Sequence, residues 1–218
     1  MFEKISEVEL YRNNVISLSK VLFSTREGKI FERDVVRHLG AVSIVPLLDD
    51  GKTVVLMSQF RASLGRPLIE VPAGKRDVVD EAPELTAIRE LEEELGLRCS
   101  LLIKLGEFEN SPGFTDEHSF AYLALGLSLG KVAPQSVEEM EASIVTVDLS
   151  RVPELISQGL ISDAKTIIGL ARTADFMARD HDQRRMLYPH AWPHGNFEQL
   201  SITDASGVSE WASLLASL

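Results

Sequence analysis

The sequence predicts an α+β fold, and three observations support this class. Short apolar segments separated by turn residues predict several β-strands before residue 72. A helical segment with one apolar side follows, and a second group of strand patterns comes after it. Two helical patterns then close the region. We therefore expect residues 1–178 to form one domain and residues 179–218 to form a C-terminal appendage, irregular except for a helical pattern over residues 208–218.

The first two predicted strands form an N-terminal β-hairpin. In residues 14–24, Val, Ile and Leu recur among polar residues, and a Glu-Gly turn leads into a second strand over residues 30–38. An Asp-Gly pair at residues 50–51 marks another turn between two apolar runs. The other expected strands cover residues 41–48, 54–60, 68–71, 101–108, 119–127 and 142–149.

Residues 83–95 have the pattern of an amphipathic helix. Pro83 suits the first helical turn, and Gly96 suits the position just after the last one. Apolar residues recur at intervals of three and four, which places them on one side of a helix. These residues are Leu85, Ile88, Leu91 and Leu95. Two further helices are expected over residues 152–158 and 164–177.

The composition excludes several classes of protein. With 33 acidic and 22 basic residues among 218, the chain has a formal net charge of −11. This charge argues against general DNA or RNA binding, because phosphate contacts need clustered Lys and Arg. A hydrophobic fraction of 44% suits an ordered globular protein. The single cysteine, Cys99, excludes an intramolecular disulfide framework.

The sequence shows neither a secretory signal nor a membrane span. Residues 1–14 carry charges throughout and lack the apolar centre of a signal peptide. No segment approaches the run of about 18 apolar residues that a membrane-spanning helix requires. We therefore expect no membrane association and a cytoplasmic location.

The chemistry of the chain is concentrated in the helix over residues 83–95. On a helix, Glu90, Glu93 and Glu94 share one side, whereas Leu91 and Leu95 lie on another. Like charges at this spacing repel each other, and the helix dipole disfavours anions near the C-terminal end. Stability therefore does not account for the arrangement. Closely spaced carboxylate oxygens are the ligands that Mg²⁺ and Mn²⁺ prefer.

The residues around these carboxylates resemble the Nudix box. That motif begins with a Gly, which is followed after five residues by a Glu. Seven residues later comes its second half, Arg-Glu-apolar-x-Glu-Glu-x-Gly-apolar. Residues 89–97 fit this second half at every defined position. Glu81 has the expected spacing to Arg89, but six residues separate it from Gly74. Asp80 has the expected spacing to Gly74, so either carboxylate is a candidate for the first Glu of the box.

The resemblance to the Nudix hydrolase family implies a fold and a metal site. The fold is an α/β/α sandwich with a mixed β-sheet. Mg²⁺, with Mn²⁺ as an alternative, is expected to bind Glu90 and Glu94, with Glu93 as a helper or an additional ligand. In the subgroup that hydrolyses ADP-sugars, the carbonyl before the box Gly also binds metal, which here is Ala73. Arg89 is expected to orient the carboxylates.

The segments on either side of the box resemble the ADP-ribose pyrophosphatase subgroup. Residues 59–61 (Gln-Phe-Arg) and 68–74 (Leu-Ile-Glu-Val-Pro-Ala-Gly) are similar to the segment that enters the box in those enzymes. Downstream, residues 111–115 (Ser-Pro-Gly-Phe-Thr) are similar to a loop of the same subgroup, with its Pro fifteen residues after Leu97. The resemblance implies that the substrate-binding residues are Arg61, Glu70, Pro112 and Gly113.

This subgroup hydrolyses the diphosphate linkage of ADP-ribose to AMP and ribose 5-phosphate. Its general base comes from a loop before the last strand, which corresponds here to residues 134–142 (Pro-Gln-Ser-Val-Glu-Glu-Met-Glu-Ala). We favour Glu139 as this base, with Glu138 and Glu141 as the alternatives in the loop and Glu93 as a further candidate. The resemblance also implies a homodimer in which the N-terminal strands of one chain help to form the other chain's substrate pocket.

Two alternative functions remain open at this point. The chain could be a Nudix hydrolase that acts on NADH, GDP-mannose or a nucleoside triphosphate. It could also be a non-catalytic Nudix-fold module that only binds a ligand. Such modules commonly lose the box carboxylates, whereas Glu90, Glu93 and Glu94 are all present here, which favours an enzyme.

Overall fold

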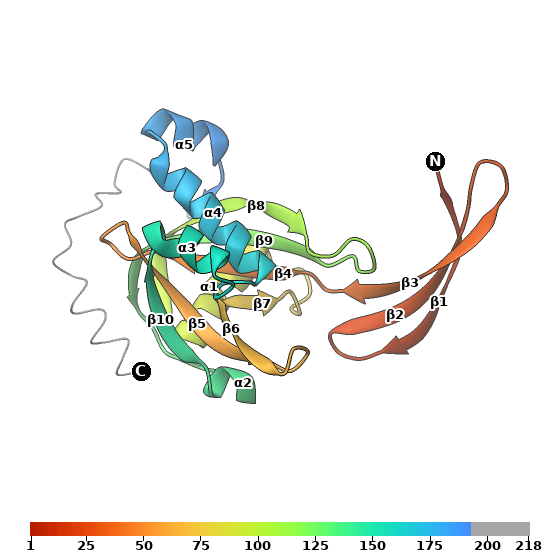
Figure 1. The fold of residues 1–218 in the computed structure, drawn as a ribbon, viewed down its shortest axis with the longest axis horizontal. Coiled ribbons are helices and arrows are strands. Elements are labelled where there is room, and N and C mark those ends of the chain that lie inside the picture. The colour runs from red at the N-terminus through yellow and green to blue at the C-terminus, as the bar shows by residue number, and fades with distance from the viewer. Residues whose placement is uncertain (193–218) are drawn as a thin grey trace.

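The computed structural model describes residues 1–192, whose strands form three β-sheets. One sheet, made by the N-terminal strands, extends away from the rest of the molecule as an arm (Figure 1). The strands are β1 (Glu3–Arg12), β2 (Ile16–Ser24), β3 (Ile30–His38), β4 (Ala41–Pro46), β5 (Thr53–Arg61), β6 (Arg66–Glu70), β7 (Ala73–Lys75), β8 (Leu97–Glu109), β9 (His118–Leu129), β10 (Ser143–Asp148) and β11 (Ala191–Trp192).

The sheets have the orders β1-β2-β3, β10-β5-β6 and β11-β8-β9-β4-β7. The five-stranded sheet is mixed, because β4 runs parallel to β9 while its other pairs are antiparallel. The helices are α1 (Pro83–Leu95), α2 (Val137–Met140), α3 (Val152–Ser157), α4 (Ala164–Ala178) and α5 (His181–Leu187), with a 3-10 helix at Leu149–Arg151. None of the helices within residues 1–192 has the length and apolar character needed to cross a membrane.

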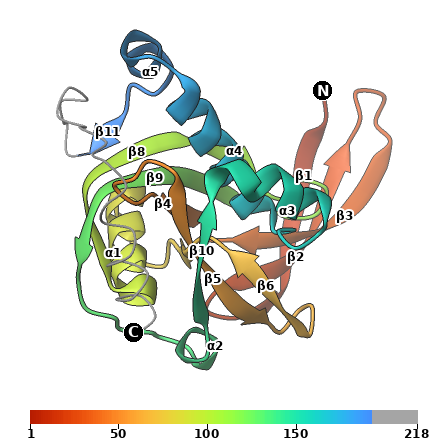
Figure 2. The same cartoon turned by 60° about the vertical axis from the view of Figure 1, so that its left-hand side comes forward.

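Two apolar cores lie on opposite sides of the mixed sheet. Successive side chains of a strand point to opposite faces, so Ile44 and Val45 of β4 enter different cores. Ile44 shares its core with Leu91 of α1, and Val45 shares the other with Leu170 of α4. Figure 2 shows α1 on one side of the sheet and α4 on the other. The predicted α+β class and α/β/α sandwich are confirmed.

Helix α1 begins and ends as the sequence predicts. Gly96 takes the left-handed conformation with φ 62°, and its N–H donates to the Glu92 carbonyl, which ends the helix. Leu91 and Leu95 are fully buried, whereas Leu85 at the first turn, which the prediction placed in the apolar stripe, is 45% exposed. The buried stripe fixes the rotation of the helix and therefore directs its acidic side away from the core.

The N-terminal arm contains the predicted hairpin, β2 and β3, and an additional strand. Strand β1 pairs with β2 in antiparallel register, for example Val8 with Lys20. No side chain of β1 is buried, so the strand is held mainly by backbone hydrogen bonds to β2. Its charged sequence gives no local sign of this pairing, which explains why the prediction missed it.

Residues 181–192 differ from the prediction of an irregular appendage. They contain α5, which starts with a capping box of Asp180 and Gln183, and β11, which pairs with β8. Tyr188 is 3% exposed and packs edge-on against Phe176 with ring centroids 5.3 Å apart. The prediction is wrong here because α5 has only seven residues and shows little helical periodicity. The predicted helix over residues 208–218 lies outside the described residues.

Candidate active site

The first feature of the site is a close approach between β7 and α1. A Cβ atom on Gly74 would lie 1.9 Å from the carboxyl carbon of Glu90, so any other residue at this position would displace the Glu90 carboxylate. The neighbouring Ala73 N–H donates to Glu94 Oε2 at 2.9 Å. The backbone of residues 73–74 therefore contacts two of the predicted metal ligands, from a short strand that the sequence pattern did not show.

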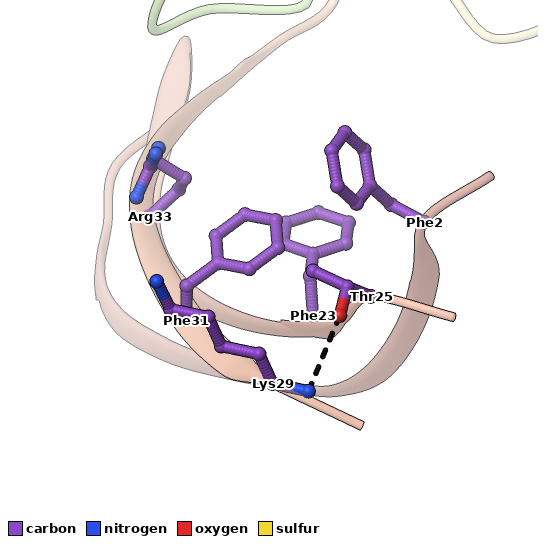
Figure 3. A pocket seen from close by; sticks show the side chains of 6 residues that line it. All are labelled: Phe2, Phe23, Thr25, Lys29, Phe31 and Arg33. Carbon is purple, nitrogen blue, oxygen red and sulfur yellow. Dashed lines mark hydrogen bonds between the residues drawn. The ribbon is translucent and has the colours of Figure 1, made fainter. Parts of the chain in front are cut away.

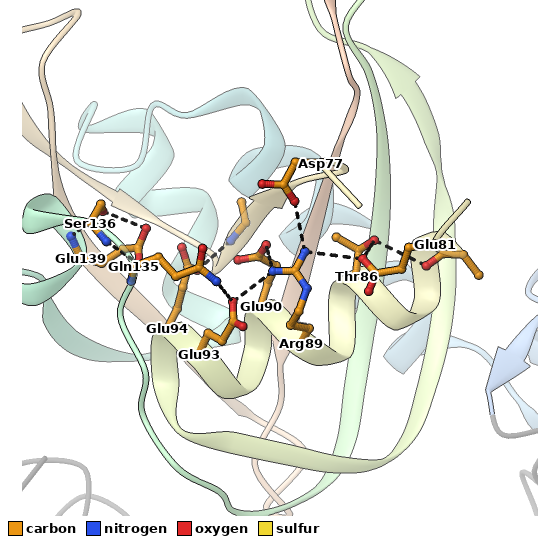
Figure 4. A network of polar contacts seen from close by, with 12 residues as sticks. Asp77, Glu81, Thr86, Arg89, Glu90, Glu93, Glu94, Gln135, Ser136 and Glu139 are labelled. Carbon is orange, nitrogen blue, oxygen red and sulfur yellow. Dashed lines mark hydrogen bonds and ion pairs between the residues drawn. The ribbon is translucent and has the colours of Figure 1, made fainter. Parts of the chain in front are cut away.

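Arg89 gathers the carboxylates of the box around its guanidinium group (Figure 4). Its Nη1 atom lies 2.9 Å from Glu90 Oε1 and 3.0 Å from Glu93 Oε2. Its Nη2 atom lies 3.5 Å from both Asp77 Oδ1 and Glu81 Oε2. These contacts hold the carboxylates in a common orientation, which is the geometry expected for the role predicted for Arg89.

The two candidates for the first Glu of the box have different surroundings. Glu81 is half-buried, contacts Arg89 and accepts a hydrogen bond from Thr86 Oγ1 at 2.8 Å. Asp80 is exposed and has φ 62°, a left-handed conformation that Asp adopts more readily than most residues. The additional loop residue is therefore accommodated at Asp80, and Glu81 keeps the contact with the box arginine.

A cavity of about 580 Å³ brings most of the predicted site residues together. Of those residues, its lining includes Arg61, Ala73, Glu90, Glu94, Glu138 and Glu139. Three others do not line the cavity but contact residues that do: Glu70, Arg89 and Glu93. The remaining three are exposed and do not line it: Pro112, Gly113 and Glu141.

Burial makes the negative charge of this cavity unfavourable. It raises the pKa of Glu90 from 4.5 to about 7 and the pKa of Glu94 from 4.5 to about 8. Arg89 lowers the pKa of Glu90, and the Ala73 N–H lowers that of Glu94, but neighbouring carboxylates, including Glu139, raise both. A divalent cation would favour the charged forms of these two groups.

The donor atoms fit a hard cation. Glu90 and Glu94 supply carboxylate oxygens at one end of a single cavity, and the Ala73 backbone lies beside them. Among the described residues, no three His, Cys, Asp or Glu side chains converge at metal-binding spacing. Each carboxylate instead contacts a protein donor, so joint binding of one ion requires rotation of these side chains. Glu93, for example, accepts hydrogen bonds from Arg89 and from Gln135 Nε2, the latter at 2.6 Å.

The cationic side of the cavity depends on a buried carboxylate. Glu70 is 1% exposed and accepts two hydrogen bonds of 2.7 Å from Nε and Nη2 of Arg61. This bidentate pair fixes the plane of the guanidinium group at the cavity wall. Lys165 of α4 also lines the cavity and was missed by the sequence prediction. It lies far from the box in sequence, and no local pattern marks it.

The predicted base loop contains α2, a helix of four residues that starts with a capping box. Ser136 Oγ accepts from the Glu139 N–H at 3.2 Å and donates to Glu139 Oε1 at 2.8 Å. The spacing Ser-x-x-Glu is a sequence signal for this arrangement, and it could have identified the helix in advance. The loop is attached to α1, since Gln135 donates to Glu93 and the Ala133 N–H donates to the Glu93 carbonyl at 3.0 Å.

Comparison with known proteins agrees with this arrangement. The NUDIX domain family matches residues 37–167, which include α1, the cavity-lining strands and the base loop. The chain belongs to the Nudix family. It is 36% identical over 162 residues to the ADP-ribose pyrophosphatase of Bacillus subtilis, covering 74% of this chain and 86% of that protein.

A second relative and a solved structure agree with this assignment. The chain is 36% identical over 169 residues to the ADP-ribose pyrophosphatase of Mycobacterium tuberculosis, covering 78% of this chain and 81% of that protein. The crystal structure of an ADP compounds hydrolase has the same fold, with a TM-score of 0.71 and 18% identity over 81% of this chain and 94% of the other. The protein is therefore a Nudix hydrolase similar to ADP-ribose pyrophosphatases.

The raised pKa values of the box carboxylates predict a pH-dependent stability. The ordinary pKa of both carboxyl groups is 4.5, and in the folded chain it is about 7 for Glu90 and about 8 for Glu94. At pH values between these limits, the two groups keep their protons in the folded chain and release them in the unfolded chain. The contribution of Glu90 and Glu94 to the free energy of unfolding therefore falls as pH rises through this window. In the presence of a chelator, we expect this fall in thermal unfolding measurements, and a smaller fall in a Glu90→Gln/Glu94→Gln double variant.

Mg²⁺ or Mn²⁺ should have the opposite pH dependence. Because a metal binds the deprotonated carboxylates, either ion should raise the unfolding temperature more at about pH 8.5 than at about pH 5.5. An equal rise at both pH values, or an equal rise in the double variant, would contradict the assignment of these two ligands.

Proposed function

We propose that this Nudix hydrolase cleaves the diphosphate linkage of ADP-ribose or a related nucleoside diphosphate sugar, giving AMP and ribose 5-phosphate from ADP-ribose. The observation that carries the proposal is that one cavity is lined both by the carboxylates Glu90 and Glu94, called here its acidic end, and by the cation Arg61, called its cationic wall. Charges of opposite sign in one cavity suit a metal ion and an anionic diphosphate bound side by side. The relatives named ADP-ribose pyrophosphatases support the same class of substrate.

The proposed metal site uses the acidic end. Glu90, Glu93, Glu94 and the Ala73 carbonyl would hold Mg²⁺, or alternatively Mn²⁺. Such an ion, when bound, neutralises charge on the diphosphate and makes a water molecule more acidic. The protein's own part is orientation: Arg89 holds Glu90 and Glu93, and the Ala73 N–H holds Glu94.

The proposed substrate contacts begin with Arg61. Its guanidinium group lines the cavity and is fixed by Glu70, so it presents its remaining donors to a diphosphate in one orientation. Glu70 itself is too deeply buried to contact substrate and acts through Arg61. The exposed turn with Pro112 and Gly113 joins the N-terminal arm, since the Val36 N–H donates to the Phe114 carbonyl at 2.8 Å. Because we propose below that the arm forms the dimer, the proposed contact of this turn with substrate depends on that dimer.

We propose Glu139 as the general base. Its half-buried side chain lines the cavity, and its charge acts on both Glu90 and Glu94. Its carboxylate contacts Ser136 Oγ and the Gln135 N–H, the latter at 2.6 Å, so it must leave the capping box to reach an attacking water. Glu138 also lines the cavity and is the first alternative.

Glu141 and Glu93 are the weaker candidates for the base. Glu141 is exposed and does not line the cavity, so it would need a rearrangement of the loop to reach the substrate. Glu93 does not line the cavity and already contacts Arg89 and Gln135, and we assign it to the metal.

The proposed metal ligands are tested by charge removal on α1. Glu90→Gln and Glu94→Gln should each lower kcat for ADP-ribose by about 100-fold or more, because they remove electrostatic stabilisation rather than core packing. Glu92→Gln is a matched control on the same helix, since Glu92 contacts Arg98 at 2.8 Å and does not line the cavity. Near-normal, Mg²⁺-dependent turnover by Glu94→Gln would refute the assignment.

Product analysis on a panel of substrates tests which nucleoside diphosphate derivative the enzyme hydrolyses. The wild-type enzyme should hydrolyse ADP-ribose, with AMP and ribose 5-phosphate as products, faster than NADH, GDP-mannose or a nucleoside triphosphate. A clear preference for one of the other three would replace the proposed substrate.

The proposed base is tested by substitution in the loop. Glu139→Gln should lower kcat by about 100-fold or more and change KM little, because a base acts in the transition state. Glu138→Gln and Glu141→Gln should have smaller effects. A loss confined to one of these two would move the base to that residue, and normal turnover by all three variants would place it outside the loop.

We also propose a homodimer formed through the N-terminal arm. A small sheet is stable only when it has an apolar face or packs against another element, and no helix of the described residues covers this one (Figures 1 and 2). Its tip carries a pocket of about 510 Å³ in which three aromatic rings, from Phe2, Phe23 and Phe31, lie beside Lys29 and Arg33 (Figure 3). An apolar surface of this kind suits contact with a second chain.

The arm is tested by its effect on assembly. Light scattering at micromolar concentration should give a dimer for the wild type and a monomer for Phe31→Asp, because the charge would be buried at the interface. Glu27→Ala in the exposed β2–β3 turn serves as the control and should remain dimeric. A monomeric wild-type protein would refute this proposal.

A further inference from the structure

The cavity contains a second fixed cation, Lys165. This residue lies in the first turn of α4, and its side chain is 20% exposed and lines the cavity together with Arg61. Its Nζ atom lies 2.8 Å from Asp163 Oδ1 and 3.9 Å from Glu70 Oε2. Glu70 Oε2 is also the atom that accepts from Arg61 Nη2 at 2.7 Å. The two cationic groups therefore flank one buried carboxylate oxygen.

Both carboxylates also have hydrogen bonds that do not involve Lys165. Asp163 is the N-cap of α4 and accepts from the Thr166 N–H at 2.9 Å and from Thr166 Oγ1 at 2.8 Å. Glu70 is already paired with Arg61 through two hydrogen bonds. A lysine ammonium group has three donors, and only the contact with Asp163 is within hydrogen-bond distance. Donors of Lys165 thus remain for a ligand in the cavity.

The ammonium group of Lys165 is suited to offset the negative charge of a bound diphosphate. A diphosphate entering beside Glu90 and Glu94 meets negative charge at one end, and a single arginine offsets only part of the charge of two phosphoryl groups. Arg61 and Lys165, which both lie beside Glu70 Oε2, line the cavity as two cations rather than one. Thr166 adds rigidity, because its buried hydroxyl accepts from the Val71 N–H at 3.0 Å and so ties α4 to the residue after Glu70.

We propose that Lys165 binds the diphosphate of the substrate together with Arg61, as the second cation of a two-cation seat. This inference rests on the proposed function and extends its binding site to α4. Lys165 contributes mainly to the affinity for substrate, whereas Glu90 and Glu94 at the acidic end contribute mainly to the rate of the chemical step.

Calorimetry with α,β-methylene-ADP tests the seat without catalysis, since the bridging carbon cannot be hydrolysed. In the presence of Mg²⁺, Lys165→Met should weaken binding of this probe about tenfold, the size expected for one charge-assisted hydrogen bond. Adenosine, which lacks phosphate, should behave alike with both proteins. Lys165→Arg should restore most of the affinity. Lys52→Met, in the exposed turn at the opposite end of β5 from Arg61, is the control for loss of a lysine.

Kinetics and thermal unfolding separate binding from a structural role. Lys165→Met should raise KM for ADP-ribose about tenfold and change kcat less than about threefold, and thermal unfolding should show that the variant is still fully folded at the assay temperature. Unchanged affinity of Lys165→Met for α,β-methylene-ADP would overturn the proposal, as would an equal loss for adenosine. A wild-type protein that binds the probe through Lys165 but does not hydrolyse ADP-ribose would refute the proposed function and leave the seat standing.

Discussion

The close approach of the Gly74 backbone to Glu90 is the constraint on which the site depends. A β-carbon at residue 74 would overlap the Glu90 carboxyl group, so glycine there leaves the space in which this carboxylate lies. Burial of Leu91 and Leu95 fixes the rotation of the same helix. Together these contacts hold Glu90 and Glu94 in a partly buried cavity, where their charged forms are disfavoured. Core packing thus offsets the electrostatic cost of the site.

The cationic wall at Arg61 is held in place by ion pairing with a buried carboxylate rather than by core packing. Glu70 is a buried charge, and a buried carboxylate is tolerated only when it is paired and hydrogen-bonded. Arg61 satisfies it through two hydrogen bonds, and Lys165 lies 3.9 Å away. The carboxylate therefore orients cations without itself contacting a ligand. The cavity holds two sets of charges of opposite sign, each fixed by a different part of the fold, which suits a cation and an anionic substrate bound together.

Local sequence patterns predicted the parts of this arrangement that are local. The helix with Glu90 and Glu94 was visible from Pro83, Gly96 and the apolar stripe, and the fold class followed from the order of elements. Strand β11 and the Lys165 contact were missed because they are long-range pairings that no short window of sequence records. Strand β1 was missed for another reason, since it pairs with the adjacent β2 but has a largely charged and exposed sequence. The choice between Asp80 and Glu81 also required the structure, because it depends on which side chain contacts Arg89.

The loop that carries Glu139, the base we propose, is a weakly held element of the fold. Helix α2 has four residues and buries none of them, so its capping box is a principal contribution to its order. Such a cap is worth about 1 kcal/mol. Release of Glu139 from Ser136 therefore costs little, while Gln135 and Ala133 keep the base of the loop attached to Glu93 on α1. A carboxylate that is held loosely, on a loop that is anchored firmly, can exchange between its cap and the attacking water without unfolding the surrounding site.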